Sequence, residues 1–300
     1  MNHFLEISQL SRHEVEQLLS RAFFFKNHLN YPAYPKCSLA NLFYENSTRT
    51  RVSFELAANK LAMPVVNLDL QVSSEAKGEL IEDTMKTLAA MGISLFVMRH
   101  QNDRLPEAMA EKCGNKIQII NAGDGKHAHP TQAMLDLMTI VEQKPNLELL
   151  KIAIVGDIRH SRVANSLQCL FGLMGVGELT LVAPEIWQPE SVHHGRITTS
   201  LHDGIADADV VICLRVQRER LLANEQLDLA SYRQHYALTR KTLAYAKKDA
   251  MLMHPGPINR GVEIDSDVAD GPQSFILQQV SNGVYTRMAI LEAMAKSLHA

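Results

Sequence analysis

Hydroxyl and guanidinium side chains crowd one short stretch early in the chain, at Ser47, Thr48, Arg49, Thr50 and Arg51. The stretch lies between an apolar run and a helical pattern, so we expect it at a strand-to-helix junction. The first N–H groups of a helix lack intrahelical partners and carry partial positive charge. Hydroxyl donors and an arginine fork added there suit a phosphate group. Ordinary helix capping beside solvated arginines is the alternative.

Two further polar groups follow apolar runs in the same half of the chain. Arg99 comes directly after the run 94–98, and His129 and Gln132 stand in the sequence HPTQ after the run 117–121. A neutral imidazole can donate to a carbonyl oxygen, and a glutamine carbonyl can accept from an amide NH2, so this pair suits a carboxamide. His127 and His129 also form HxH, which leaves a metal site as an alternative, although no carboxylate or cysteine accompanies them at a known ligand spacing.

The second half of the chain repeats the pattern with arginines. Arg162 lies in GDIRHSR after the run 152–155, and Arg215 and Gln217 follow the run 210–214, with Arg220 just beyond. Guanidinium groups at two strand ends could bind a dicarboxylate, and solvated strand ends are the alternative. The turn HPGPINR, residues 254–260, could aim backbone carbonyls at an amine.

Taken together, these residues favour transfer between two bound anionic substrates by positioning and electrostatics. The sequence has no GxSxG elbow, no GxxxxGKS or GxxxxGKT loop and no GxGxxG after a strand. A serine hydrolase and the two common nucleotide-binding folds are therefore not supported.

Short apolar runs alternate with helical patterns along the whole chain, which predicts an α/β fold with parallel sheets and crossover helices. The predicted strands span residues 39–44, 65–70, 94–98, 117–121, 152–156, 179–182 and 210–214. The predicted helices span residues 11–28, 50–62, 79–91, 105–112, 131–142, 161–174, 240–248 and 283–299. In open sheets of this kind ligands bind beyond the carboxyl ends of the strands, which is where the polar groups fall.

Composition narrows the class of protein. The 300 residues are 46% hydrophobic and 21% charged, with a net charge of -3, as in soluble globular proteins rather than nucleic-acid binders. No apolar run is long enough to span a bilayer, and the N-terminus lacks the plan of a signal peptide. The scattered cysteines Cys37, Cys113, Cys169 and Cys213 read as buried free thiols of a cytoplasmic protein.

Three motifs in order resemble the aspartate/ornithine carbamoyltransferase superfamily, and within it the aspartate carbamoyltransferase catalytic chains. They are STRTR at 47–51, HPTQ at 129–132 and HPGPINRGVEI at 254–264, and the resemblance covers essentially the whole chain. It implies two α/β domains, each a parallel sheet flanked by helices. Residues 1–132 would bind carbamoyl phosphate, residues 133–282 would bind aspartate, and the C-terminal helix 283–300 would pack back on the first domain.

The resemblance also implies a role for each matching residue. Ser47, Thr48, Arg49 and Thr50 would bind the phosphate, and Arg99, His129 and Thr50 the carbamoyl oxygen. Gln132 would hold the carbamoyl nitrogen. The two aspartate carboxylates would be bound by Arg162, Arg215 and Gln217, with the turn at Gly256 and Pro257. Ser73 and Lys77 match a loop that enters a neighbouring subunit's site, Lys77 contacting both substrates, and Glu45 and Arg220 match positions used in domain closure.

The implied activity is carbamoyl transfer to the α-amine of L-aspartate, the committed step of pyrimidine (UMP) biosynthesis, without metal or cofactor. The implied assembly is a homotrimer with shared active sites. The resemblance leaves open whether regulatory or dihydroorotase-like chains join two trimers. No nucleic-acid or membrane partner is expected.

Other functions remain open from the sequence. Ornithine carbamoyltransferase shares STRTR, but it usually shows HPCQ and HCLP where this chain has HPTQ and HPGP. A non-catalytic anion-binding subunit would be expected to lose some of Lys77, Arg99, His129 and Arg215, and all four are present. A metal-dependent hydrolase using His127 and His129 would lose activity on chelation.

Overall fold

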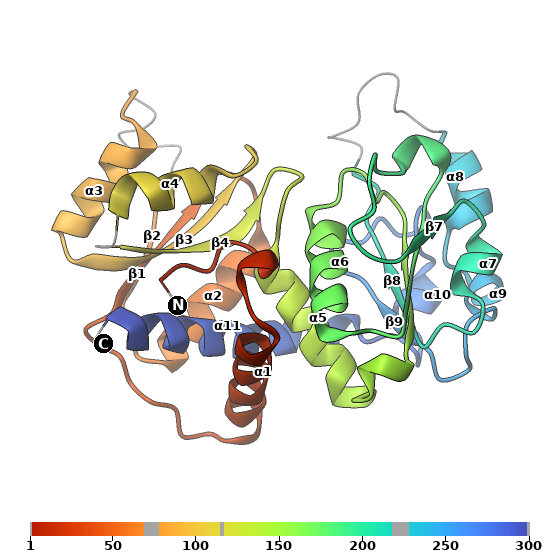
Figure 1. The fold of residues 1–300 in the computed structure, drawn as a ribbon, viewed down its shortest axis with the longest axis horizontal. Helices are drawn as coiled ribbons and strands as arrows, with labels where there is room; N and C mark the ends of the chain where they lie inside the picture. Colours follow the sequence, from red (N-terminus) through yellow and green to blue (C-terminus); the bar gives the residue numbers. More distant parts are fainter. Residues whose placement is uncertain (1, 69–77, 115–116, 218–227, 299–300) are drawn as a thin grey trace. The chain divides into compact units, whose positions relative to one another are not determined.

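A computed structural model describes residues 2–68, 78–114, 117–217 and 228–298 of the chain. The chain divides into two compact units, one formed by residues 1–135 and 280–300 and the other by residues 136–279. Each unit contains one parallel sheet with helices on both faces, which confirms the predicted fold class (Figure 1). No helix in the described part of the chain has the length and apolar character needed to cross a membrane.

Unit 1 contains a four-stranded parallel sheet in the order β2-β1-β3-β4. Its strands are β1 (Ser38–Phe43), β2 (Val65–Asn67), β3 (Ile93–His100) and β4 (Gln118–Asp124). Strand β2 ends earlier than the predicted run 65–70, whose last two positions lie outside the described residues. The chain starts in the middle of the sheet, goes outward to β2 and returns to the other side of β1, so the strand order reverses between β1 and β3.

The side chains of this sheet alternate between two helical layers, as successive residues of a strand must. Ala40, Leu42, Phe96 and Met98 form a buried cluster with residues of α3 (Ile81–Ala90) and α4 (Leu105–Cys113). Helices α1 (Arg12–Asn27), α2 (Thr48–Lys60) and α11 (Ile276–Leu298) lie on the opposite side (Figure 1).

The C-terminal helix α11 belongs to unit 1 from residue 280 onward. Glu292 accepts hydrogen bonds from Arg21 on α1 and from Tyr34, and the guanidinium of Arg287 lies 5.1 Å from the centre of the Phe54 ring on α2. The prediction that this helix begins at Gly283 is wrong, because it begins at Ile276. Gly283 permits close packing within the helix, since a Cβ there would lie 2.5 Å from Arg287 Nη1.

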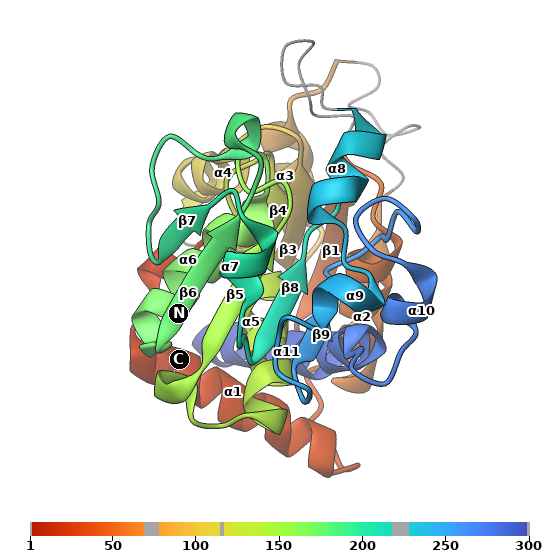
Figure 2. The same ribbon diagram turned by 90° about the vertical axis from the view of Figure 1, so that its right-hand side faces the viewer.

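Unit 2 contains a five-stranded parallel sheet in the order β7-β6-β5-β8-β9. Its strands are β5 (Lys151–Val155), β6 (Glu178–Val182), β7 (Arg196–Thr198), β8 (Val210–Cys213) and β9 (Met251–Met253), seen side by side in Figure 2. The order reverses between β5 and β8, whose residues pair directly from Ile152 with Val210 to Val155 with Cys213.

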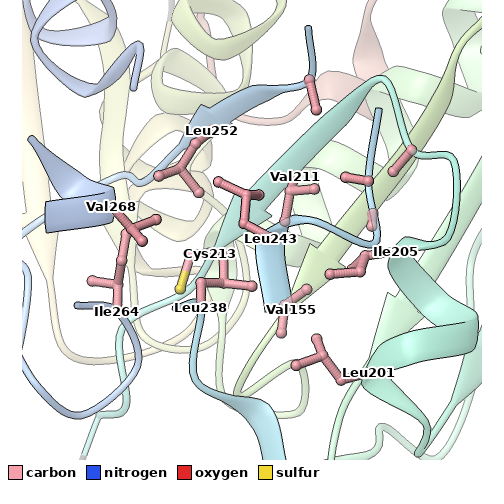
Figure 3. Close-up of a cluster of buried hydrophobic side chains, with 14 of the residues drawn as sticks. Val155, Leu201, Ile205, Val211, Cys213, Leu238, Leu243, Leu252, Ile264 and Val268 are labelled. Atoms are coloured by element: carbon pink, nitrogen blue, oxygen red, sulfur yellow. The ribbon is translucent and has the colours of Figure 1, made fainter. Parts of the chain in front are cut away.

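One face of the second sheet forms an apolar core. Val155, Val211, Cys213 and Leu252 point into it from the strands, and Leu238, Leu243, Ile264 and Val268 pack against them from loops and short helices (Figure 3). The helices of this unit are α6 (Arg162–Met174), α7 (Leu201–Ile205), α8 (Leu229–Tyr236), α9 (Arg240–Leu243) and α10 (Ser266–Ala269). Helix α5 (Pro130–Gln143) begins in unit 1 and ends in unit 2.

Several elements differ from the sequence predictions. Strands β7 and β9 were not predicted, because each has only three residues and lacks a distinct alternating pattern. The predicted helix 240–248 ends at Leu243, since the following backbone bonds elsewhere: Tyr245 O accepts from Asp207 N, and Lys247 N donates to Ala208 O. All four cysteines are free, as predicted, although Cys113 and Cys169 are only half-buried.

Candidate active site

The predicted phosphate-binding residues lie where unit 1 reverses its strand order. Strand β1 ends at Phe43, which pairs with Arg99 of β3, so the segment that follows β1 leaves the sheet beside Arg99. Strand β4 ends one strand further on and leads through a loop to His129. The carboxyl ends of β1, β3 and β4 therefore bring three of the predicted residue groups to one edge of the sheet.

Helix α2 begins at this edge with Ser47 as its N-terminal capping residue. Within the described residues, the Ser47 side chain makes no capping hydrogen bond, so the helix-capping alternative is not supported. Thr48 and Arg49 are exposed on the first turn, whereas Thr50 is buried. The first turn of α2 thus presents backbone N–H groups together with hydroxyl and guanidinium donors, as an oxyanion requires.

Arg99 is held in place by its neighbours at the same edge. Its Nε lies 3.2 Å from Oε2 of Glu45, and its Nη1 donates to the carbonyl oxygen of Ala122 at 3.4 Å. Both charged side chains are largely buried, with 15% and 21% of their surface exposed for Arg99 and Glu45. A guanidinium oriented in this way needs little reorganisation before it meets a negatively charged oxygen.

His129 and Gln132 lie at the start of α5. The carbonyl oxygen of His129 accepts from the backbone N–H groups of Gln132 and Ala133, and Pro130 occupies the first helical position. Both side chains are buried, with 5% and 7% exposed. Five residues before His129, the carboxylate of Asp124 accepts a hydrogen bond from Ala128 N and so fixes the approach to this helix.

The HxH metal alternative is not supported by the geometry of His127. Its Nδ1 lies 2.9 Å from Asp124 Oδ2 and its Nε2 lies 3.0 Å from Glu6 Oε1. Hydrogen bonds to Asp124 and then to Glu6 raise the pKa of His127 to about 9, so both nitrogens carry protons at neutral pH. A protonated imidazole has no lone pair for a metal. Among the described residues there is no cluster of His, Cys, Asp and Glu that could hold a metal ion.

In unit 2, Arg162 lies at the start of α6, immediately after the turn that follows β5. Ser161 caps this helix by accepting from Ala164 N at 3.2 Å. Asp157 shapes the turn, because its Oδ1 lies 3.1 Å from the backbone N and 2.8 Å from the ring Nδ1 of His160. Arg162 is buried, with 5% exposed.

The segment after β8 carries Arg215 and Gln217 and is tied to the turn after β5. Leu214 N donates to Val155 O at 2.7 Å, and Gln217 Nε2 donates to His160 O at 3.2 Å. Arg215 and Gln217 are half-buried. The structure therefore brings together the two segments that carry the predicted carboxylate-binding residues.

The turn at Gly256 and Pro257 is held by a buried pair that the sequence did not indicate. His254 Nε2 lies 3.3 Å from Glu263 Oε1, which also accepts from Asn259 N. Asn259 Nδ2 in turn donates to Val216 O at 3.1 Å, so the turn is joined to the segment after β8. The Gly256–Pro257 peptide bond is cis.

Ser73, Lys77 and Arg220 lie outside the described residues. The supporting residues Asp157, His160, Asn259 and Glu263 were not predicted, although they lie within the quoted motifs, because the sequence does not show that their side chains bond to one another or to the segment after β8. For Asp157, the position between a buried strand and a capping serine is the one signal that could have found it.

Two family models cover nearly the whole chain. The model of the aspartate/ornithine carbamoyltransferase carbamoyl-P binding domain matches residues 2–142. The model of the aspartate/ornithine carbamoyltransferase Asp/Orn binding domain matches residues 148–294.

Curated and solved relatives agree with these models. The chain is 65% identical over 297 residues to the aspartate carbamoyltransferase catalytic subunit of Legionella pneumophila (strain Corby), covering 99% of this chain and 100% of that protein. The structure is similar to the catalytic subunit of M. jannaschii aspartate transcarbamoylase, with a TM-score of 0.85, 33% identity and 99% of each chain covered. It is also similar to Trypanosoma cruzi aspartate transcarbamoylase in complex with carbamoyl aspartate and phosphate, with a TM-score of 0.86, 27% identity and coverage of 97% and 95%.

Proposed function

The chain belongs to the aspartate/ornithine carbamoyltransferase family, and we propose that it transfers the carbamoyl group of carbamoyl phosphate to the α-amine of L-aspartate. The products are N-carbamoyl-L-aspartate and phosphate, and the reaction is the committed step of pyrimidine biosynthesis. The observation that carries this proposal is the 65% identity, over 99% of the chain, to a protein named as an aspartate carbamoyltransferase catalytic subunit. The arginines of unit 2 favour a dicarboxylic acceptor over ornithine, which is a cationic diamino acid.

In this proposal unit 1 binds carbamoyl phosphate. The phosphate lies at the N-terminus of α2 on Ser47, Thr48, Arg49 and Thr50. Two observations support that placement: Thr48 and Arg49 are exposed, and in the described part of the chain the Ser47 side chain makes no capping hydrogen bond to the helix. Arg99 and His129 donate to the carbamoyl oxygen together with Thr50, and Gln132 accepts from the carbamoyl NH2 group.

Unit 2 binds aspartate in this proposal. Arg162, Arg215 and Gln217 hold its carboxylates, and the hydrogen bond from Gln217 to the turn before Arg162 supports their action as one group. The turn at Gly256 and Pro257 presents backbone carbonyls to the α-amine, and Asn259 holds it against the segment after β8.

The reaction proceeds by attack of the α-amine on the carbamoyl carbon. A C–N bond forms, and the carbonyl electron pair moves to the oxygen, where Arg99, His129 and Thr50 stabilise the negative charge. The electron pair on the oxygen then re-forms the carbonyl bond as the C–O bond to phosphate breaks, and the departing phosphate takes the amine proton. Ser73 and Lys77 of a neighbouring subunit complete the phosphate site, and Glu45 and Arg220 act in domain closure.

We assign the domains and the assembly in the same way. Residues 1–132 with 283–300 form the carbamoyl phosphate domain, and residues 133–282 form the aspartate domain. The chain acts in the cytoplasm as a homotrimer. Val52 and Leu56, one turn apart on α2, are 43% and 46% exposed, and they lie on the helix whose N-terminus the neighbour's loop must reach. The double variant Val52→Asp with Leu56→Asp should fail to form the trimer, which light scattering measures. A trimer that persists in this variant would contradict an interface on α2.

Kinetics of His129→Ala and Arg49→Ala test the assigned roles. Removing one donor to the developing charge should lower kcat/KM by about 10²–10³-fold. Arg51→Ala is the matched control for Arg49→Ala, because Arg51 is also an exposed arginine of α2 but is not assigned to the phosphate. Near-normal kcat/KM in both test variants would rule out the scheme.

A further inference from the structure

Asp124, at the end of β4, organises the loop that leads to His129. Its carboxylate is buried, with 1% of the residue exposed, and accepts from Arg104 N at 2.6 Å, Asn121 Nδ2 at 2.8 Å and Ala128 N at 3.0 Å. Its own backbone N donates to Ala128 O at 3.1 Å. These bonds close the loop on itself directly before α5, so the conformation of the loop decides where His129 is placed.

His127 joins this loop to the N-terminal segment of the chain. Its ring lies between Asp124 Oδ2 and Glu6 Oε1, at 2.9 Å and 3.0 Å. The segment that carries Glu6 runs along β4, because Phe4 exchanges backbone hydrogen bonds with Ile119 and Asn121. The imidazole thus contacts carboxylates on both the segment and the loop.

The charge of this ring decides whether both contacts hold. A neutral imidazole has a single N–H and can donate to only one of the two carboxylates, whereas the imidazolium donates to both. The two hydrogen bonds raise the pKa of His127 to about 9, so the charged form is present at neutral pH. Other titratable and charged groups on the surrounding elements, among the described residues, include His3, His100, Asp103, Lys126 and Arg104, which binds Glu6 and Glu107.

We infer that His127 is a positioning residue for the transfer reaction, because the imidazolium locks the loop 124–129 and so fixes His129 for the carbamoyl oxygen. The inference rests on the proposed function, since His127 acts through His129 and touches no substrate. Loss of this positioning should lower kcat/KM for carbamoyl phosphate and leave aspartate binding unchanged. It also depends on pH, since loss of the ring proton releases one of the two carboxylates.

The test replaces His127 by glutamine in the full-length chain. His127→Gln keeps a hydrogen-bond donor but no charge, and we expect kcat/KM for carbamoyl phosphate to fall roughly tenfold at neutral pH, because small displacements of catalytic groups are costly. The KM for aspartate should stay unchanged. The ratio of wild-type to variant kcat/KM should shrink toward one as the pH rises past about 9, since the wild type then loses the same proton. His202→Gln is the matched control, as His202 is an exposed histidine beside Asp203 in unit 2.

Two further measurements keep the test decisive. Glu6→Gln removes the charge of the carboxylate that His127 contacts on the N-terminal segment, so kcat/KM for carbamoyl phosphate should fall in this variant too. The double variant should have a kcat/KM no lower than that of His127→Gln alone. NMR of the His127 ring should show a titration near 9 in the wild type. A ratio that does not vary with pH, additive effects of the two variants, or titration near the ordinary value would overturn the inference. A wild type that makes no carbamoyl aspartate contradicts the proposed function instead. The NMR titration would then still test whether His127 is held between Asp124 and Glu6.

Discussion

The Nε atom of Arg99 lies 3.2 Å from Oε2 of Glu45, so a carboxylate that follows strand β1 holds a guanidinium at the end of strand β3. The contact follows from the pairing of Phe43 with Arg99, which places the end of β1 beside the arginine. A group that must stabilise a developing negative charge is most effective when it is already oriented. Glu45 is thus placed to orient Arg99, the residue that we propose binds the carbamoyl oxygen.

Replacing Glu45 by glutamine tests this orientation. Glu45→Gln keeps the size of the side chain and removes its charge, so kcat/KM for carbamoyl phosphate should fall about tenfold as Arg99 becomes mobile. The unfolding free energy should also fall, by about 1–3 kcal/mol, because both side chains are largely buried and glutamine removes the negative charge beside Arg99. Steady-state kinetics and urea unfolding measure both effects. Glu55→Gln, on α2, is the control, and equal kinetics for the two variants would contradict the assignment.

Replacing Arg215 by alanine should weaken aspartate binding alone. Hydrogen bonds to charged groups contribute about 1.5–3 kcal/mol, so the KM for aspartate should rise roughly 10- to 100-fold. Binding of carbamoyl phosphate, measured by calorimetry, should not change. Arg233→Ala, which removes an arginine paired with Asp265 on the surface of the same unit, is the control. A comparable loss of carbamoyl phosphate affinity in Arg215→Ala would show that the arginine serves another role.

The stability of the protein should depend on the charge of His127 at alkaline pH. The folded pKa is raised from 6.5 to about 9, so the unfolded chain loses this proton first as the pH rises. The stabilisation is therefore fully present below the unfolded pKa and is lost as the pH rises through about 9. On the acid side, the hydrogen bond from His127 lowers the pKa of Glu6, so that contribution is lost as the pH falls through the lowered value.

Thermal unfolding across a pH series measures this dependence. The wild type should lose more stability between neutral pH and about pH 10 than His127→Gln does, since the variant has no proton to lose there. His202→Gln should follow the wild type. Parallel curves for the wild type and His127→Gln would contradict the raised pKa.

Gly156, which follows β5, should not tolerate a side chain. Its φ is +132°, and a Cβ would lie 3.0 Å from Leu214 O and 3.1 Å from Leu214 Cβ. Gly156→Ala should therefore cost about 1–3 kcal/mol of unfolding free energy and push apart the segments that carry Arg162 and Arg215. Gly261→Ala is the matched control, because Gly261 also has a positive φ but has no atom within 4 Å of the added Cβ. Denaturant unfolding should rank Gly156→Ala as the less stable variant.

Much of the fold could be predicted because strongly apolar runs and helix signals are local. The strands that contain Arg99 or lead to His129, Arg162 and Arg215 were all predicted, and parallel pairing places the ends of these strands at a common edge within each sheet. Ser161, directly before a periodic apolar pattern, likewise marks the start of α6. An element could be predicted where its sequence signal and its structural contacts involve the same few neighbouring residues.

The parts that could not be predicted depend on contacts between distant residues. His254 and Glu263 stabilise the turn at Gly256 through a buried pair, and Asn259 joins that turn to Val216, which lies 43 positions earlier. The predicted helix began at Gly283, yet the structure extends it back to Ile276, and Gly283 lies where Arg287 packs closely. In each case tertiary packing decides the role of a residue whose local preference suggests another one.

The most direct test of the central proposal is a competition between acceptors. The purified full-length protein is supplied with carbon-13 carbamoyl phosphate and equal concentrations of L-aspartate and L-ornithine, and the labelled products and free phosphate are quantified by NMR. We predict labelled N-carbamoyl-L-aspartate in a one-to-one ratio with phosphate and no labelled citrulline. Citrulline as the main product, or phosphate release without transfer to either amino acid, would contradict the proposal.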